Sequence, residues 1–117
     1  SEKSLKLLKK CIEEANIRTS EWGGKMYFVY LPEYNRYKGF RNHEKYGRRK
    51  KILDIIKFLK IPIIDVHIEV FNNIEDKLSL FPFRYNGHYN AKGYRLVAET
   101  ISNRLKNDGI IPSDLKN

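Results

Sequence analysis

The sequence has 117 residues, of which 41% are hydrophobic and 32% are charged, and its formal net charge is +9 at pH 7. This length suits one domain of small size, residues 1–117, and this balance argues against intrinsic disorder. No apolar run reaches the roughly 18 to 20 residues of a membrane span, so no membrane span is expected. The excess of Lys and Arg suits a polyanionic partner such as nucleic acid, anionic lipid or acidic polysaccharide, without choosing among them.

A helix is predicted over residues 4–16, where Ser4 supplies an N-cap hydroxyl and apolar side chains recur at helical spacing. The apolar positions are Leu5, Leu8, Ile12 and Ala15. Cys11 lies beside this stripe, so we expect a buried thiol, and a single cysteine excludes an internal disulfide. Residues 16–25 are predicted to form a loop in which two consecutive glycines allow a tight turn.

Two short apolar runs, residues 26–31 and 61–66, have the aromatic and β-branched composition of strands buried on both faces. Between them, a basic run over residues 41–51 leads into a helix over residues 52–59. Strands that alternate with helices predict an α/β fold with parallel strands. Because two strands alone make a marginal sheet, either further strands escape this prediction, or the chain is part of a larger α/β domain, or it pairs with itself.

An irregular connection over residues 69–83 leads to a last helix, predicted over residues 91–106 with Asn90 as its N-cap. His88 lies in the loop that enters this helix, after a glycine that permits a sharp bend of the backbone. An imidazole on such a loop can act as a general base, because its pKa lies near neutrality. The alternative is a structural histidine whose ring bonds to nearby backbone.

The run from Phe81 to Ile101 contains the pattern His-x-Asn-x-x-Gly-Tyr, followed by Leu-Val-Ala-Glu-Thr-Ile. This block is similar to the C-terminal block of the SGNH (GDSL-type) hydrolase family, and the preceding order of strand, helix and strand also resembles that family. The resemblance implies a flavodoxin-like α/β/α sandwich and a serine esterase or acyltransferase, with His88 as general base. It implies an ester substrate such as an O-acylated carbohydrate or lipid. It also implies that residues 1–117 are the C-terminal portion of the domain, which pairs with a missing N-terminal half or with itself. Neither a cofactor nor a metal is expected.

Two positions depart from the family pattern. The nucleophile of the family lies in a Gly-Asp-Ser segment, which this sequence lacks, so we expect the nucleophilic serine to lie outside residues 1–117. The chain alone is therefore predicted to be inactive. Where the family has an aspartate shortly before the histidine, this sequence has Asn86, which can orient an imidazole but cannot stabilise its charge. A Ser-His dyad, or a carboxylate such as Asp76, is the alternative to Asn86 as partner of His88.

The loop over residues 33–40 leaves the carboxyl end of the first strand, where ligands of open α/β sheets gather. With the resemblance, this loop is predicted to border the ester, and we expect Tyr34, Arg36 and Tyr37 to contact the substrate. The alternative function is a non-catalytic α/β module that binds polysaccharide or nucleic acid through the basic and aromatic segment 34–51. Of these two partners, carbohydrate is the one that we expect.

A metal site is the remaining alternative. If the second strand continues, alternation places Asp65, His67 and Glu69 on one face, with His88 as a further ligand. A strand-end aspartate more often accepts hydrogen bonds from the backbone amides of a neighbouring loop, and we expect that role for Asp65. No metal is therefore predicted.

Overall fold

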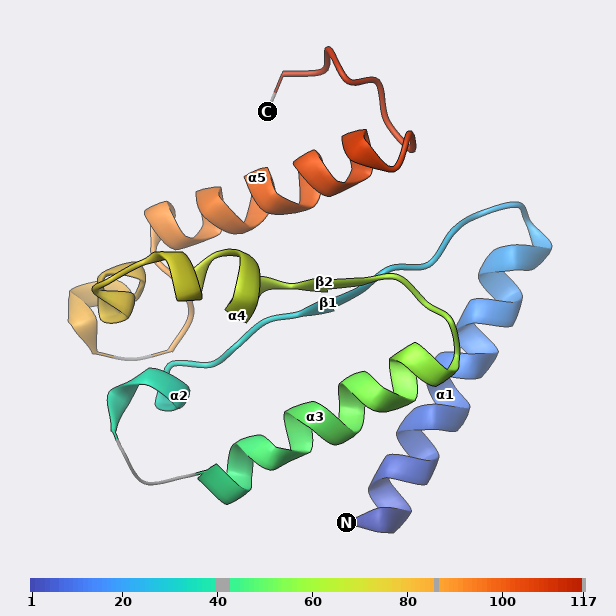
Figure 1. The fold of residues 1–117 in the computed structure, drawn as a ribbon, viewed down its shortest axis with the longest axis horizontal. Coiled ribbons are helices and arrows are strands. Elements are labelled where there is room, and N and C mark those ends of the chain that lie inside the picture. The colour runs from blue at the N-terminus through green and yellow to red at the C-terminus, as the bar shows by residue number, and fades with distance from the viewer. Residues whose placement is uncertain (40–42, 86, 117) are drawn as a thin grey trace. The chain divides into compact units, whose positions relative to one another are not determined.

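The fold is given by a computed structural model that describes residues 1–39, 43–85 and 87–116, with the backbone alone for residues 43–46. Figure 1 shows its elements in chain order. They are α1 (Glu2–Glu21), β1 (Phe28–Tyr30), α2 (Asn35–Lys38), α3 (His43–Phe58), β2 (Ile63–Asp65), α4 (Val66–Glu69), the 3-10 turns η1 (Phe71–Asn73), η2 (Lys77–Leu80) and η3 (Pro82–Arg84), and α5 (Ala91–Asn107).

β1 and β2 pair as a two-stranded parallel sheet, which confirms the predicted α/β class with parallel strands. Each strand has three residues and is therefore shorter than the apolar run that predicted it. The chain divides into two compact units, and the division falls within both strands: the first holds Ser1–Val29 and Asn42–Ile63, the second Tyr30–Arg41 and Ile64–Asn117. The expectation of one domain over residues 1–117 stays a prediction.

The first unit consists mainly of α1 and α3, which contact each other (Figure 1). Its core cluster contains Ile12 of α1, Ile56 of α3 and Ile61 after α3, all buried. α3 begins at His43, so much of the basic run that precedes residue 52 is itself helical. Lys and Arg are good helix formers, and the exposed positions on α3 let their charges remain in water.

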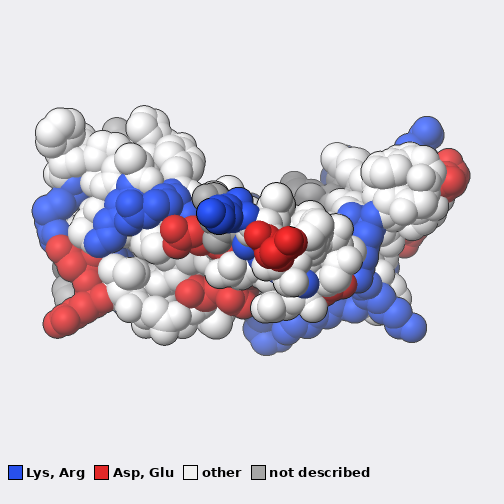
Figure 2. Space-filling view, turned by 90° about the horizontal axis from the view of Figure 1, so that it is seen from above, with Lys and Arg blue, Asp and Glu red and all other residues white. Residues whose placement is uncertain are grey.

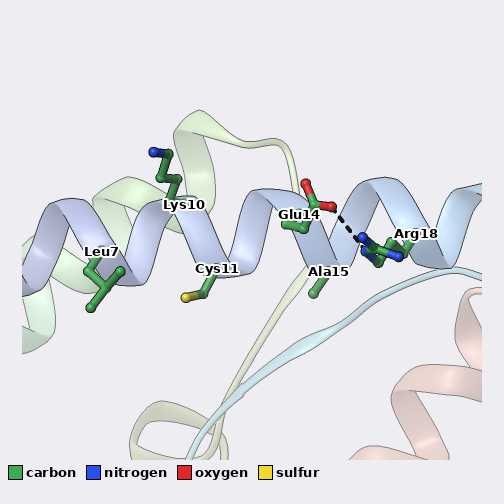
Figure 3. A pocket seen from close by; sticks show the side chains of 6 residues that line it. All are labelled: Leu7, Lys10, Cys11, Glu14, Ala15 and Arg18. Atoms are coloured by element: carbon green, nitrogen blue, oxygen red, sulfur yellow. Dashed lines mark hydrogen bonds and ion pairs between the residues drawn. The ribbon is translucent and has the colours of Figure 1, made fainter.

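Cys11 is exposed, and the prediction of a buried thiol was wrong. The stripe of α1 that faces the core runs through Ile12, and successive residues of a helix differ by about 100° in direction, so Cys11 points away from it. Figure 3 shows Leu7, Cys11 and Ala15 along one side of α1. Together with Lys10, Glu14 and Arg18 these residues line a surface hollow of about 540 Å³.

The second unit is built around aromatic rings. Phe71, Phe81 and Tyr89 are buried and contact one another, with ring centroids 5.4 to 5.9 Å apart. They come from η1, from the residue between η2 and η3, and from the residue before Asn90, so one cluster ties the irregular segment to the start of α5.

Within the described residues, no helix combines the length and the apolar character that crossing a membrane requires.

Candidate functional site

The chain turns sharply where β2 ends, because Asp65 caps α4. Its Oδ1 accepts hydrogen bonds from the backbone N–H groups of His67 (3.1 Å) and Ile68 (3.4 Å). Asp65 was expected to accept from the backbone amides of a neighbouring loop; it does accept from backbone amides, but from those of α4, the helix that it caps. The alternation that would have placed Asp65, His67 and Glu69 on one face is wrong, because helix replaces strand from Val66 onward. Among the described residues, no three His, Cys, Asp or Glu side chains come together as metal ligands.

The short α4 presents the His67 ring to the loop that follows β1. Nδ1 of His67 lies 2.7 Å from the Tyr37 hydroxyl, and Nε2 lies 3.4 Å from Arg36 Nη2. A guanidinium can only donate, so Nε2 must accept and the ring proton must sit on Nδ1, which donates to the Tyr37 oxygen. The half-buried His67 is thus a neutral imidazole that links the segments following the two parallel strands.

Tyr37 is held on its other side by an aromatic stack. Its ring lies 4.6 Å from that of Phe71 at an interplanar angle of 11°. Burial raises the pKa of the Tyr37 hydroxyl well above its ordinary value, and the positive charge of Arg36 opposes this rise only in part. Tyr37 therefore keeps its proton throughout the physiological range.

The structure brings together two of the three residues predicted to contact substrate. Arg36 and Tyr37 meet at His67, whereas Tyr34 packs edge-on against Phe81, with ring centroids 5.4 Å apart. Their role in substrate binding stays a prediction. The sequence did carry a signal for the turn at His67, because Asp65 directly after a buried strand is a typical N-cap. Nothing in the sequence pattern pointed to the pairing of His67 with Tyr37.

His88 lies on the surface of the same unit. Its Nδ1 is 2.9 Å from the carbonyl oxygen of Tyr89, and its ring stacks on that of Tyr94 at 6.3 Å and 18°. A carbonyl oxygen only accepts, so Nδ1 carries a proton, and in the neutral ring Nε2 carries the lone pair. Within the described part of the chain, this is the only hydrogen bond of the ring. Nε2 is the atom that a general base requires.

The segment around His88 is held by the residue that caps α5. Asn90 Oδ1 accepts from the N–H of Gly93 (2.9 Å), and Asn90 Nδ2 donates to the carbonyl of Ser79 (2.8 Å). The backbone N–H of Asn90 also donates to the carbonyl of Leu80 (2.8 Å). The predicted N-cap is therefore confirmed, and the same residue joins α5 to η2.

Gly93 lets α5 approach η2 closely. A Cβ atom at this position would lie 2.8 Å from the carbonyl oxygen of Leu80 and 2.9 Å from Cβ of Tyr89, closer than real Cβ contacts. The glycine of the His-x-Asn-x-x-Gly pattern is thus required by packing. It keeps the backbone next to His88 against the buried part of the unit.

Tyr89 connects this block to the end of β1. Its buried hydroxyl donates to the carbonyl of Pro32 at 2.5 Å, and burial raises its pKa above the ordinary value. Through Tyr89, a continuous series of ring contacts joins the two histidines, each pair of centroids 4.6 to 6.3 Å apart. In order, the rings are His67, Tyr37, Phe71, Tyr89, Tyr94 and His88.

The predicted partners of His88 have different outcomes. Asn86 lies outside the described residues. Asp76, the alternative carboxylate, forms an ion pair with Arg84 and not with His88. A side chain was expected as the partner of His88 Nδ1. The backbone carbonyl of Tyr89 accepts this hydrogen bond instead.

A scan against protein-family models, a search of curated proteins and a search of solved structures each gave no match. The likeness of residues 81–101 to the SGNH hydrolases accordingly stays a prediction.

Proposed function

We propose that the chain is part of an acyl-transfer enzyme of the SGNH type, with a flavodoxin-like α/β/α arrangement and His88 as general base. The observation that carries this proposal is the exposed His88 ring, whose Nδ1 donates to the Tyr89 carbonyl while Nε2 keeps its lone pair. The nucleophilic serine comes from outside residues 1–117.

In this reaction, Nε2 of His88 accepts the proton of the serine hydroxyl as the serine oxygen attacks the ester carbonyl. The proton then passes to the leaving alcohol, and an acyl-enzyme remains. Water, or a second hydroxyl, releases the acyl group after His88 takes its proton. A backbone carbonyl at Nδ1 maintains the correct tautomer but stabilises the imidazolium less than a carboxylate does. The proposed base therefore lacks the charge stabilisation that a carboxylate supplies in a complete triad.

Hydrolysis of p-nitrophenyl acetate tests the proposal in the 117-residue chain and in the complete product of its gene. We expect no activity from the chain alone. In the complete product, His88→Ala is expected to lower kcat by about 10²- to 10⁴-fold, the range for loss of a general base. His67→Ala is the matched histidine control, with circular dichroism to verify folding. Full activity of the His88→Ala product, or hydrolysis by the chain alone that depends on His88, would overturn the proposal.

A second candidate function is binding of a polyanion or polysaccharide through the segment 34–51. It is favoured by the exposure of Arg48, Lys50 and Lys51 on α3. Against it, Lys50 pairs with Asp54 at 2.8 Å and lowers the pKa of that carboxyl, and Figure 2 shows basic and acidic side chains interspersed on the face drawn. A salt-dependent gel shift with RNA, weakened by Arg48→Gln with Lys51→Gln, would support this candidate.

A further inference from the structure

The turn η3, which precedes His88 in the chain, has an unusual backbone. Phe83 (φ 54°) and Arg84 (φ 58°) are consecutive and both lie in the left-handed region. Side chains with a Cβ disfavour this region, and for a bulky residue such as Phe it is an outlier. Such strain persists only where the surrounding structure imposes it, and it concentrates at functional sites.

The strained turn holds aromatic side chains out into solvent. Phe83 is 98% exposed and Tyr85 is 67% exposed, whereas Phe81 beside them is buried. Neither exposed ring contributes apolar burial that would compensate the strain. Burial therefore does not account for the outward position of these two rings, whereas a binding role does.

The turn is nevertheless well anchored. The backbone N–H of Arg84 donates to the Phe81 carbonyl (3.1 Å), and that of Tyr85 donates to the Pro82 carbonyl (3.0 Å). The side chain of Arg84 is paired with Asp76. The two exposed rings thus stand on a backbone fixed at several points, which reduces the entropy lost when a ligand binds to them.

Tyr85 is close to the proposed base along the chain. Tyr85 is three residues from His88, a span of at most about 11 Å between Cα atoms. On the other side, Tyr94 stacks on the His88 ring and is itself 54% exposed. Exposed aromatic surface therefore precedes and follows His88 in one compact unit.

We infer that Phe83 and Tyr85, with Tyr94, form an aromatic platform that stacks on the sugar rings of a polymeric carbohydrate ester and delivers its ester group to His88. This inference rests on the proposed function. A sugar ring offers an apolar C–H face to an aromatic ring and hydroxyls to the tyrosine oxygens, and a polymer lies across an open surface. A long acyl chain gains most from an enclosed apolar pocket, not from rings exposed on a surface.

Affinity electrophoresis tests this platform without requiring catalysis. The chain is run in native gels with and without soluble O-acetylated xylan or O-acetylated glucomannan, and binding to phosphatidylcholine vesicles is measured in parallel. The variants are Phe83→Ala, Tyr85→Ala and the double variant, with Phe83→Gly as a second form that also removes the strain. Phe58→Ala, at a 71% exposed phenylalanine of the first unit, is the matched control.

We expect at least one of the two polymers to retard the wild-type chain, and Phe83→Ala and Tyr85→Ala each to weaken binding at least about five-fold, as for loss of one stacking ring. Phe58→Ala should bind like the wild type, and because binding is measured without catalysis, failure of the esterase proposal would leave this result intact. Absence of retardation by both polymers would contradict the inference. So would wild-type binding by the double variant, or vesicle binding that depends on Phe83.

Discussion

His67 and His88 lie in the same compact unit and at the two ends of one series of ring contacts, yet their rings are held differently. His67 is half-buried, and its two nitrogens contact Tyr37 and Arg36. His88 is exposed, and within the described residues its ring is bonded only at Nδ1, by a backbone carbonyl. The tautomer of His67 is set by Arg36, which can only donate, and that of His88 by the Tyr89 carbonyl, which can only accept.

This difference is the one that we expect between a structural histidine and the general base proposed for His88. A ring bonded at both nitrogens fastens two segments of chain to each other, and protonating it would lose the hydrogen bond from Arg36. A ring bonded at one nitrogen is oriented while its lone pair remains free to take a proton. Four predictions, in order of decreasing effect, test this contrast.

The backbone beside His88 is the most sensitive point. Gly93→Ala is expected to lower the free energy of unfolding by about 1 to 3 kcal/mol, because the new methyl group overlaps the Leu80 carbonyl and Cβ of Tyr89. Urea denaturation followed by circular dichroism measures the change. Gly39→Ala is the control, since a Cβ at Gly39 would meet no atom of the described residues within 4 Å and should alter stability little. Equal effects of the two substitutions would show that α5 does not pack as described.

Truncation of each histidine compares the two directly. His67→Ala should cost about 1 to 2 kcal/mol, because the Tyr37 hydroxyl loses its partner in a half-buried position. His88→Ala should change stability by less than about 0.5 kcal/mol, as for an exposed side chain. Thermal and urea unfolding of both variants provide the measurement. Similar losses of unfolding free energy in the two variants would contradict the contrast between His67 and His88.

Relieving the strain in the turn η3 should stabilise the chain and weaken its binding to the carbohydrate polymer. Phe83→Gly is expected to raise the free energy of unfolding by about 1 kcal/mol, because glycine adopts a φ of 54° without a steric cost. Tyr85→Gly is the matched control, since its φ of −122° is negative and glycine there relieves no left-handed strain. A loss of stability in Phe83→Gly would mean that the turn is not strained.

Alkaline pH probes the two buried tyrosines. Because burial raises the pKa of Tyr37 and Tyr89 above the unfolded value, the folded state binds more protons, and stability is fully present below about pH 10 and falls as the pH rises beyond it. For each tyrosine, the loss at pH 10.5 is below about 1 kcal/mol. Urea midpoints at pH 8, 10 and 10.5 measure it. Tyr89→Phe should reduce the alkaline fall, whereas Tyr85→Phe should leave it unchanged.

Local patterns in the sequence predicted a substantial part of this structure. The apolar runs located both strands, and the residue before the last helix was recognised as its cap. These features depend on neighbours within a few positions, which is why they can be predicted from spacing and residue type. The boundaries of α1 and α3 were underestimated, because exposed Lys, Arg and Glu continue a helix without adding to its apolar stripe.

The candidate site also has features that the local sequence predicts and features that it does not. The sequence alone determined that a histidine precedes a helix capped by Asn90, whereas the packing that requires a glycine at Gly93 became visible only in the structure. Only the tertiary structure decided that Tyr37 and Arg36 meet the ring of His67, 30 and 31 residues away, and that Tyr89 bonds to Pro32. It also decided that Cys11 faces solvent. Such contacts depend on which surfaces the packed elements turn toward one another, and no local periodicity encodes that choice.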